Sequence, residues 1–172
     1  MIDRKHRWYA IYTRPKAEKK VYEELLLRNI ESYLPLQRSL KQWYDRKKWI
    51  ETPLIRSYVF VKINNREYFK TIKIDGIVRF VTFEGQPAPI PETQIKSLRI
   101  LLASDEELEV SDEKFEPGDP VEVRSGPFAR LKGELVEYRG SKKVLVRIDH
   151  IGQSVFVTIP EIRLKLLSGI NF

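Results

Sequence analysis

Residues 115–138, FEPGDPVEVRSGPFARLKGELVEY, carry the pattern that decides the fold of the C-terminal part of the chain. The run Pro117-Gly118-Asp119-Pro120 predicts a turn, because proline lacks a backbone donor and glycine tolerates positive φ. Val121 and Val123 then alternate with charged residues, which is the period-two pattern of a half-buried strand. A second turn at Ser125-Gly126-Pro127 follows, and Gly133 within the next apolar run indicates a bulge or a sharp corner. Together these features predict a small, tightly curled sheet.

This segment resembles the KOW motif, which occurs in the C-terminal barrel of NusG-type transcription factors and in some ribosomal proteins. The resemblance is carried by Phe115-Glu116-Pro117-Gly118, Val121, Ser125-Gly126-Pro127-Phe128 and Gly133. It implies a small SH3-like β-barrel that works with nucleic-acid machinery. By itself it does not distinguish transcription from the ribosome.

The composition limits the classes of function that need to be considered. The 172 residues suffice for one ordinary domain or two small ones. There is no cysteine and there are only two histidines, so we expect no disulfide, no thiolate nucleophile, no metal site and no cofactor. Carboxylate pairs such as Glu23-Glu24 have no nearby nucleophile or phosphate-binding glycine loop, and we do not expect an enzyme. No apolar run approaches membrane-spanning length, which predicts a cytoplasmic protein without a membrane partner.

The net charge of +7 is unevenly distributed along the chain. Residues 1–102 hold 21 Lys and Arg against 11 Asp and Glu, residues 103–114 hold 1 against 6, and residues 115–172 hold 9 against 7. A contact with a polyanion is therefore expected in the N-terminal part. A solvated positive face without a partner explains the charge equally well.

The apolar patterns predict an α+β fold with two domains. Strands are expected at 7–12, 33–36, 57–63 and 76–83, with 57–63 central, and helices at 15–28, 66–72 and 92–102. Thr13 is expected to cap the first helix and Pro15 to occupy its first turn, while 85–91 reads as a rigid loop. We predict an N-terminal antiparallel sheet sandwich with helices over residues 1–102. An acidic flexible linker over 103–114 and a barrel over 115–172 follow.

Residues 39–54, SLKQWYDRKKWIETPL, predict a charged hairpin whose tip is at Asp45-Arg46. Cations alternate there with aromatic residues, which suits phosphate contacts and stacking on unpaired bases. The alternative is a charged hairpin whose tryptophans pack onto the sheet. The residues predicted to bind nucleic acid here are Lys41, Trp43, Arg46, Lys47 and Lys48.

Both halves together resemble the NusG family over nearly the whole chain. The N-terminal resemblance is carried by Trp8-Tyr9, Ser57-Tyr58-Val59-Phe60-Val61, the stretch 76–81 and Pro87-Ala88-Pro89-Ile90. The stretches 33–36, 42–49 and 79–85 look closest to UpxY-type paralogues, which are antiterminators of surface-polysaccharide operons.

The resemblance implies that the N-terminal domain docks on the clamp helices of RNA polymerase. The matching positions are Leu54, Ile55, Tyr58 and Phe60. A core role is a strong alternative for Phe60, and Leu54 and Ile55, just outside the strand, are the better candidates for contact. Many relatives have Pro-Gly or Pro-Asn where this chain has Arg56-Ser57, so the rim of the pocket is expected to differ.

The family further implies contact between the first helix and the non-template DNA strand of the transcription bubble. The matching positions are Arg14, Lys16 and Lys20. Phe128 matches a contact loop of the barrel, whose implied partner is a small-subunit ribosomal protein or the termination factor Rho. The predicted function is a transcription elongation and antitermination factor that suppresses pausing or termination. A housekeeping elongation factor and a ribosome-associated RNA-binding protein remain as alternatives.

Overall fold

The computed structural model describes residue 2 and residues 4–167, and it divides into two compact units. Residues 1–92 form the N-terminal unit and residues 93–172 form the C-terminal unit. Both contain antiparallel sheets, and the predicted α+β class with a C-terminal β unit is confirmed. Among the described residues, no helix is long and apolar enough to cross a membrane.

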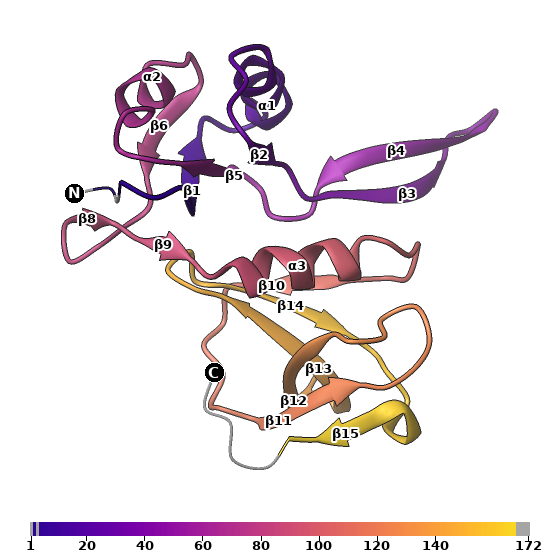
Figure 1. Cartoon of the computed structure of the whole chain (residues 1–172). Coiled ribbons are helices and arrows are strands. Elements are labelled where there is room, and N and C mark those ends of the chain that lie inside the picture. The colour runs from indigo at the N-terminus through magenta and orange to yellow at the C-terminus, as the bar shows by residue number, and fades with distance from the viewer. Residues whose placement is uncertain (1, 3, 168–172) are drawn as a thin grey trace. The chain divides into compact units, whose positions relative to one another are not determined.

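The N-terminal unit is built on a sheet in which β5 (Tyr58–Ile63) lies between β2 (Ser32–Tyr33) and β1 (Arg7–Thr13) (Figure 1). The strands β6 (Ile77–Phe80) and β9 (Pro89–Ile90) also pair with β1. The central position of β5 was predicted from its apolar residues on both faces. It is confirmed by the pairing.

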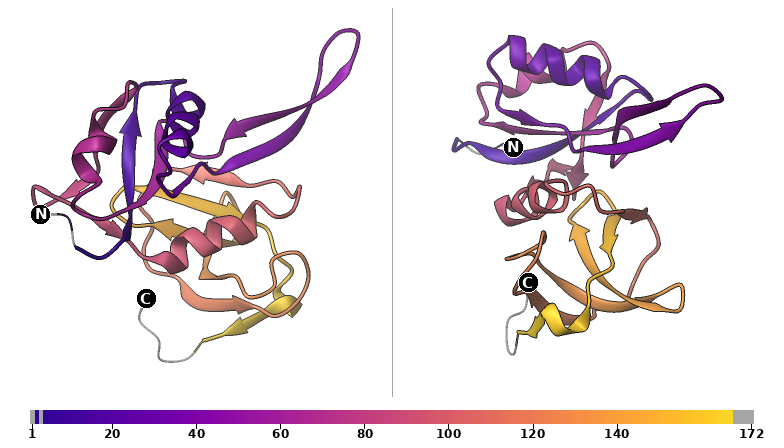
Figure 2. Two further views of the ribbon diagram at one scale, coloured as in Figure 1. Left: turned by 45° about the horizontal axis from the view of Figure 1, so that its top comes forward. Right: turned by 90° about the vertical axis from the view of Figure 1, so that its right-hand side faces the viewer.

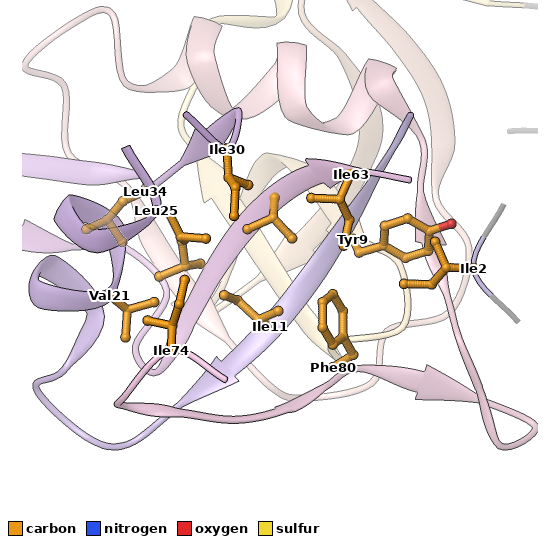
Figure 3. Close-up of a cluster of buried hydrophobic side chains, with 12 residues drawn as sticks. Ile2, Tyr9, Ile11, Val21, Leu25, Ile30, Leu34, Ile63, Ile74 and Phe80 are labelled. Atoms are coloured by element: carbon orange, nitrogen blue, oxygen red, sulfur yellow. The ribbon is translucent and has the colours of Figure 1, made fainter. Parts of the chain in front are cut away.

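One face of this sheet is covered by α1 (Glu18–Leu27) and α2 (Tyr68–Ile72). Alternate residues of the central strands, among them Tyr9, Ile11 and Val61, point into this layer because successive side chains in a strand face opposite sides. Val21 and Leu25, four residues apart on α1, meet them in a closed core (Figure 3). The opposite face of the same sheet is left for other residues, which form the candidate site below.

The start of α1 differs from the prediction. The helix begins at Glu18, after Lys16 with a φ of +65° and the N-cap Ala17, so that Pro15 lies before the helix and Thr13 does not cap it. The physical reason is tertiary: the N–H of Thr13 donates to Ser57 and that of Arg14 to Gly76, which fixes this backbone outside the helix.

Two hairpins extend from the N-terminal unit. The long one pairs β3 (Leu36–Gln42) with β4 (Lys47–Pro53) and projects away from the sheet (Figure 2). The short one pairs β7 (Thr82–Phe83) with β8 (Gln86–Pro87). The segment predicted as a rigid loop, 85–91, therefore contains β8 and β9.

The C-terminal unit holds a six-stranded sheet in the order β10-β14-β13-β12-β11-β15. Its strands are β10 (Glu109–Ser111), β11 (Asp119–Val123), β12 (Lys132–Tyr138), β13 (Ser141–Ile148), β14 (Gln153–Val157) and β15 (Leu164–Leu166). The helix α3 (Glu92–Leu101) precedes them and a short 3₁₀ helix (Glu161–Arg163) comes before β15. A core cluster forms around Tyr138 and Phe156, whose rings stack at 4.3 Å, and Phe115 packs against both.

The acidic segment 103–114 was predicted to be a flexible linker, but the structure places β10 inside it. Val110 pairs with Val155 of β14, and Leu108 is buried. These two apolar residues are two positions apart, which is the spacing of a strand face. The compact units also divide before α3 and not after it.

Candidate functional site

The second face of the N-terminal sheet carries a group of aromatic rings, which we call the aromatic face: Tyr12, Tyr33, Tyr58 and Phe60. Tyr12 and Tyr58 are direct cross-strand partners, and their rings meet edge to face at 5.4 Å. Tyr33 of β2 stacks on Phe60 at 6.4 Å. The guanidinium of Arg79 lies 5.5 Å from the centre of the Tyr12 ring. The result is two pairs of rings on the same face of three strands, with the fully buried Phe60 in one pair and a cation beside the other.

The turn before β5 is fixed by contacts from two other segments. Ser57 has a φ of +64°, a backbone conformation that glycine and asparagine adopt more readily than serine. Its N–H donates to a carboxylate oxygen of Glu18 at 2.7 Å, and its carbonyl accepts from the N–H of Thr13 at 2.8 Å. Glu18 is buried, at 5% exposure. Contacts from α1 and β1 therefore hold serine in a conformation that glycine or asparagine adopts more readily.

Replacing Glu18 with alanine is expected to cost about 2 kcal/mol of stability, because it leaves the buried Ser57 N–H without an acceptor. Glu18→Gln should recover most of the loss, since the amide oxygen can accept the same hydrogen bond. Urea unfolding followed by tryptophan fluorescence measures this, because all three tryptophans lie within residues 1–92. Glu23→Ala, at an exposed position of the same helix, is the control. Equal losses for Glu18→Ala and Glu23→Ala would contradict the assignment.

The four residues predicted to bind polymerase differ in how accessible they are. Tyr58 is half-buried, whereas Leu54, Ile55 and Phe60 are 8%, 1% and 0% exposed. The N–H of Leu54 donates to the carbonyl of Pro35 at 2.8 Å. Within this surface, Tyr58 is therefore the predicted residue whose side chain can be altered with the least disturbance of packing.

Burial raises the pKa of Tyr58 above its ordinary value of 10.0, and this outweighs the lowering effect of nearby Arg79. The folded protein therefore holds the phenolic proton to a higher pH than the unfolded chain does. This contribution to stability is complete below the ordinary pKa and is lost as the pH rises through the folded-state pKa. We expect Tyr58→Phe to lose less stability than the wild type over that alkaline range. Urea midpoints measured against pH test this, and identical slopes for both proteins would refute it.

The predicted DNA-contacting residues before and on α1 surround one carboxylate. Asp75 accepts hydrogen bonds from Lys20, at 3.1 Å, and from Arg14. The hydrogen bond from Lys20 and the charge of Arg14 together lower the pKa of Asp75. Lys16 is exposed on the adjoining turn. Arg14 and Lys20 thus meet at Asp75, and Lys16 is exposed two residues after Arg14; we call these three residues the basic corner.

A lysine of α1 connects this helix to the base of the long hairpin. The ammonium group of Lys19 donates to the carbonyl of Glu51 in β4 at 2.7 Å. The hairpin residues predicted to bind nucleic acid are all exposed, including Trp43 at 60%. The turn at the hairpin's end is centred on Tyr44-Asp45, because the N–H of Trp43 donates to Arg46. This is one residue earlier than the predicted tip.

Phe128, predicted to contact a partner of the C-terminal unit, lies in the loop between β11 and β12 and is only 5% exposed. Large apolar side chains that are well exposed in the same unit are Ile162 and Leu166, at 92% and 65%.

A comparison against known families assigns the chain to one of them. A family model described as "Transcription termination factor nusG" matches residues 6–99, which is more than half of the chain. The chain belongs to the NusG family. NusG proteins are transcription factors and not enzymes, so the predicted class of protein is confirmed at this level.

Relatives with the same description align along most of the chain. The transcription termination/antitermination protein NusG of Campylobacter jejuni is 29% identical over 170 residues, covering 90% of this chain and 93% of that protein. That of Rickettsia typhi is 23% identical over 155 residues, covering 82% and 81%. A solved structure of Thermotoga maritima NusG, described by its domain interaction, covers 95% of this chain with a TM-score of 0.53 at 23% identity. This likeness supports the fold.

Several residues of the candidate site were not predicted from the sequence. Tyr12, Tyr33 and Arg79 join the aromatic face only because β2, β1 and β6 lie near one another in the sheet. Glu18 supports the Ser57 turn from 39 positions earlier in the chain. The alternation of Tyr12 with Ile11 and Thr13 was the one available signal, since it places Tyr12 on the face opposite the core.

Proposed function

We propose that this NusG-family chain binds RNA polymerase through the aromatic face and holds the transcribing complex in its elongating state, suppressing pausing or termination. The observation that carries the proposal is the presence of two pairs of rings on the sheet face opposite the core, on a unit that matches the NusG family. Aromatic rings that present large, rigid surfaces are the usual anchors of a helix-in-groove interface. The clamp helices of the polymerase are the proposed partner, and Leu54 and Ile55 would support the rim of the groove.

The proposed mechanism is mechanical and involves no covalent step. A protein that binds the closed elongating polymerase more tightly than the opened, paused form shifts the population toward elongation. The basic corner is proposed to lie along the non-template DNA strand, where its cations would contact phosphates.

Pause lifetimes of the polymerase, measured with and without the full-length chain, test the proposal. We expect the wild type to shorten pauses and the double variant Tyr12→Ala, Tyr58→Ala to lose most of this effect while remaining folded. Phe69→Ala removes an exposed ring of α2 and should act like the wild type. Unchanged pause lifetimes with the wild-type chain would overturn the proposal.

We further propose that the chain is a specialised, UpxY-type antiterminator that acts at surface-polysaccharide operons. The stretches 33–36, 42–49 and 79–85 support this, and the second of them forms the outer end of the basic hairpin. Chromosome-wide occupancy distinguishes the two roles: binding at one operon supports specialisation, and binding at most transcribed genes supports a housekeeping factor.

The C-terminal unit is proposed to recruit a second protein, either a small-subunit ribosomal protein or Rho, through the loop that contains Phe128. Residues 115–172 are close to charge balance, with 9 Lys and Arg against 7 Asp and Glu, which favours a protein partner over RNA. Affinity purification at high salt tests this assignment. Recovery of ribosomal subunits without polymerase would instead support the ribosome-associated alternative.

A further inference from the structure

The long hairpin is a two-sided ribbon whose sides differ in chemistry. In an antiparallel pair, residues directly opposite each other point to the same side, and the side alternates at each step. Lys41 pairs with Lys48, and the same register continues to Trp43 and Arg46. We call the side that carries these four residues the tip face. Lys47 pairs with Gln42 and therefore points to the opposite side, although it is adjacent in sequence to two tip-face residues.

The tip face carries three cations, and Asp45 in the turn at the hairpin's end is adjacent in sequence to Arg46. Two further cross-strand pairs lie on the same side of the hairpin, Gln37 with Thr52 and Ser39 with Ile50, and all four residues are uncharged. Within residue 2 and residues 4–167, no carboxylate forms an ion pair with Lys41, Arg46 or Lys48. Like charges directly across a strand pair destabilise the pair, so Lys41 and Lys48 do not serve the folding of the hairpin. An external polyanion would relieve this repulsion.

On the opposite side of the hairpin, the charge of Arg38 is compensated by a carboxylate of the same side, and Lys47 is a second cation nearer the tip. Arg38 pairs with Glu51 in register, and their charged groups lie 3.9 Å apart. The guanidinium of Arg38 also lies 5.2 Å from the centre of the Trp49 ring. Trp49 is thus covered in part by a cation of its own side, whereas Trp43 is 60% exposed on the tip face beside three cations.

We propose that the tip face binds single-stranded nucleic acid, with Trp43 stacking on an unpaired base and Lys41, Arg46 and Lys48 contacting the flanking phosphates. An exposed ring within a row of cations suits a single strand, because a duplex offers phosphates but no free base face. Lys47 and Trp49 take no part in this contact. This assignment rests on the proposed nucleic-acid role of the N-terminal unit. Within the hairpin, it restricts nucleic-acid binding to the tip face.

The experiment measures binding of the full-length chain to fluorescent oligothymidylate, oligouridylate and a duplex of equal length, without polymerase. We expect both single strands to bind more tightly than the duplex. Lys48→Glu should weaken single-strand binding about tenfold and lower the slope of log affinity against log salt by about 0.7, the value for one lost phosphate contact. Lys47→Glu changes the net charge equally and should weaken binding less than Lys48→Glu does, because the side chain of Lys47 points to the other side of the hairpin and makes no phosphate contact in the proposed complex.

A second pair of variants tests the stacking contact. Trp43→Ala should weaken binding about tenfold, and Trp43→Phe should recover part of the loss, because loss of a base–aromatic stack has an effect of this size. Circular dichroism confirms that each variant is folded. Equal losses for Lys47→Glu and Lys48→Glu, equal affinity for the duplex, or absence of binding would each overturn the assignment. Because no polymerase is present, failure here is separate from failure in the pausing assay.

Discussion

Replacing Gly118 with alanine is expected to destabilise the C-terminal unit by about 3 kcal/mol, because there is no space for the added methyl group. A Cβ at this position would lie 2.4 Å from the carbonyl oxygen of Leu135 and 2.7 Å from a methyl group of Val136. The oxygen belongs to the backbone of β12, and Leu135 is the register partner of Asp119. Moving it would break the pairing of β11 with β12. Amide hydrogen exchange in β12 measures the effect, since this unit contains no tryptophan.

Gly152→Ala is the comparison variant, because it introduces backbone strain without the steric clash expected for Gly118→Ala. Gly152 has a φ of +66°, but a Cβ there would have no other atom within 4 Å. Alanine at this position should cost about 1 kcal/mol, the penalty for a side chain in the left-handed conformation. If Gly118→Ala costs no more than Gly152→Ala, then close approach of the backbone is not the reason for glycine at 118.

The glycine-containing turns show how far a local pattern predicts structure. The alternation of Val121 and Val123, with Gly133 in the next apolar run, predicted two short strands, and the strands are present as β11 and β12. The predicted turn at 117–120 is shorter than expected, because Asp119 and Pro120 already pair with β12. Gly133 was expected at a bulge or a corner. The register of β11 with β12 runs through it without a shift, and the close neighbour is the carbonyl of Leu145, 2.6 Å from a Cβ placed there. A bulge is therefore not present in this pairing, and the close approach of the β13 backbone is what leaves no room for a side chain at 133.

The start of α1 could not be predicted, because the deciding contacts are distant in sequence. Thr13 and Pro15 have the types that begin helices. The backbone N–H groups of Thr13 and Arg14 are instead taken by Ser57 and Gly76. Tertiary hydrogen bonds thus override a local propensity worth only about 1 kcal/mol.

In the hairpin, the sequence indicated cations and aromatic rings suited to nucleic acid, but the predicted set of binding residues combines side chains from both sides of the ribbon. Alternation alone separates Lys47 from Arg46 and Lys48, so this distinction was available from the pattern. The contact of Arg38 with the Trp49 ring could not be predicted from the pattern, because it depends on the strand register, in which residue 38 pairs with residue 51.

Replacing Glu134 with alanine should cost the C-terminal unit about 3 kcal/mol, because one carboxylate satisfies several partners at once. Its oxygens accept hydrogen bonds from Arg147 at 2.6 and 3.1 Å and from the N–H of Gly118 at 2.9 Å. The hydrogen bond from Arg147 is also the main reason that the pKa of this guanidinium is raised. Arg147 in turn donates to the carbonyl of Phe115 at 2.9 Å. The ion pair therefore holds the turn at residues 115–118 against β12 and β13.

The control for this prediction is Glu137→Ala, the same change at an exposed position of the same strand, which should cost no more than about 0.5 kcal/mol. The double variant Glu134→Ala, Arg147→Ala completes a cycle whose coupling should be about 2 kcal/mol. Hydrogen exchange of the Gly118 amide provides a local reading, because only loss of the carboxylate removes its acceptor. A Glu134→Ala protein as stable as Glu137→Ala would show that the turn is held by its prolines and glycine alone. The charged pair would then have to be explained by something other than folding.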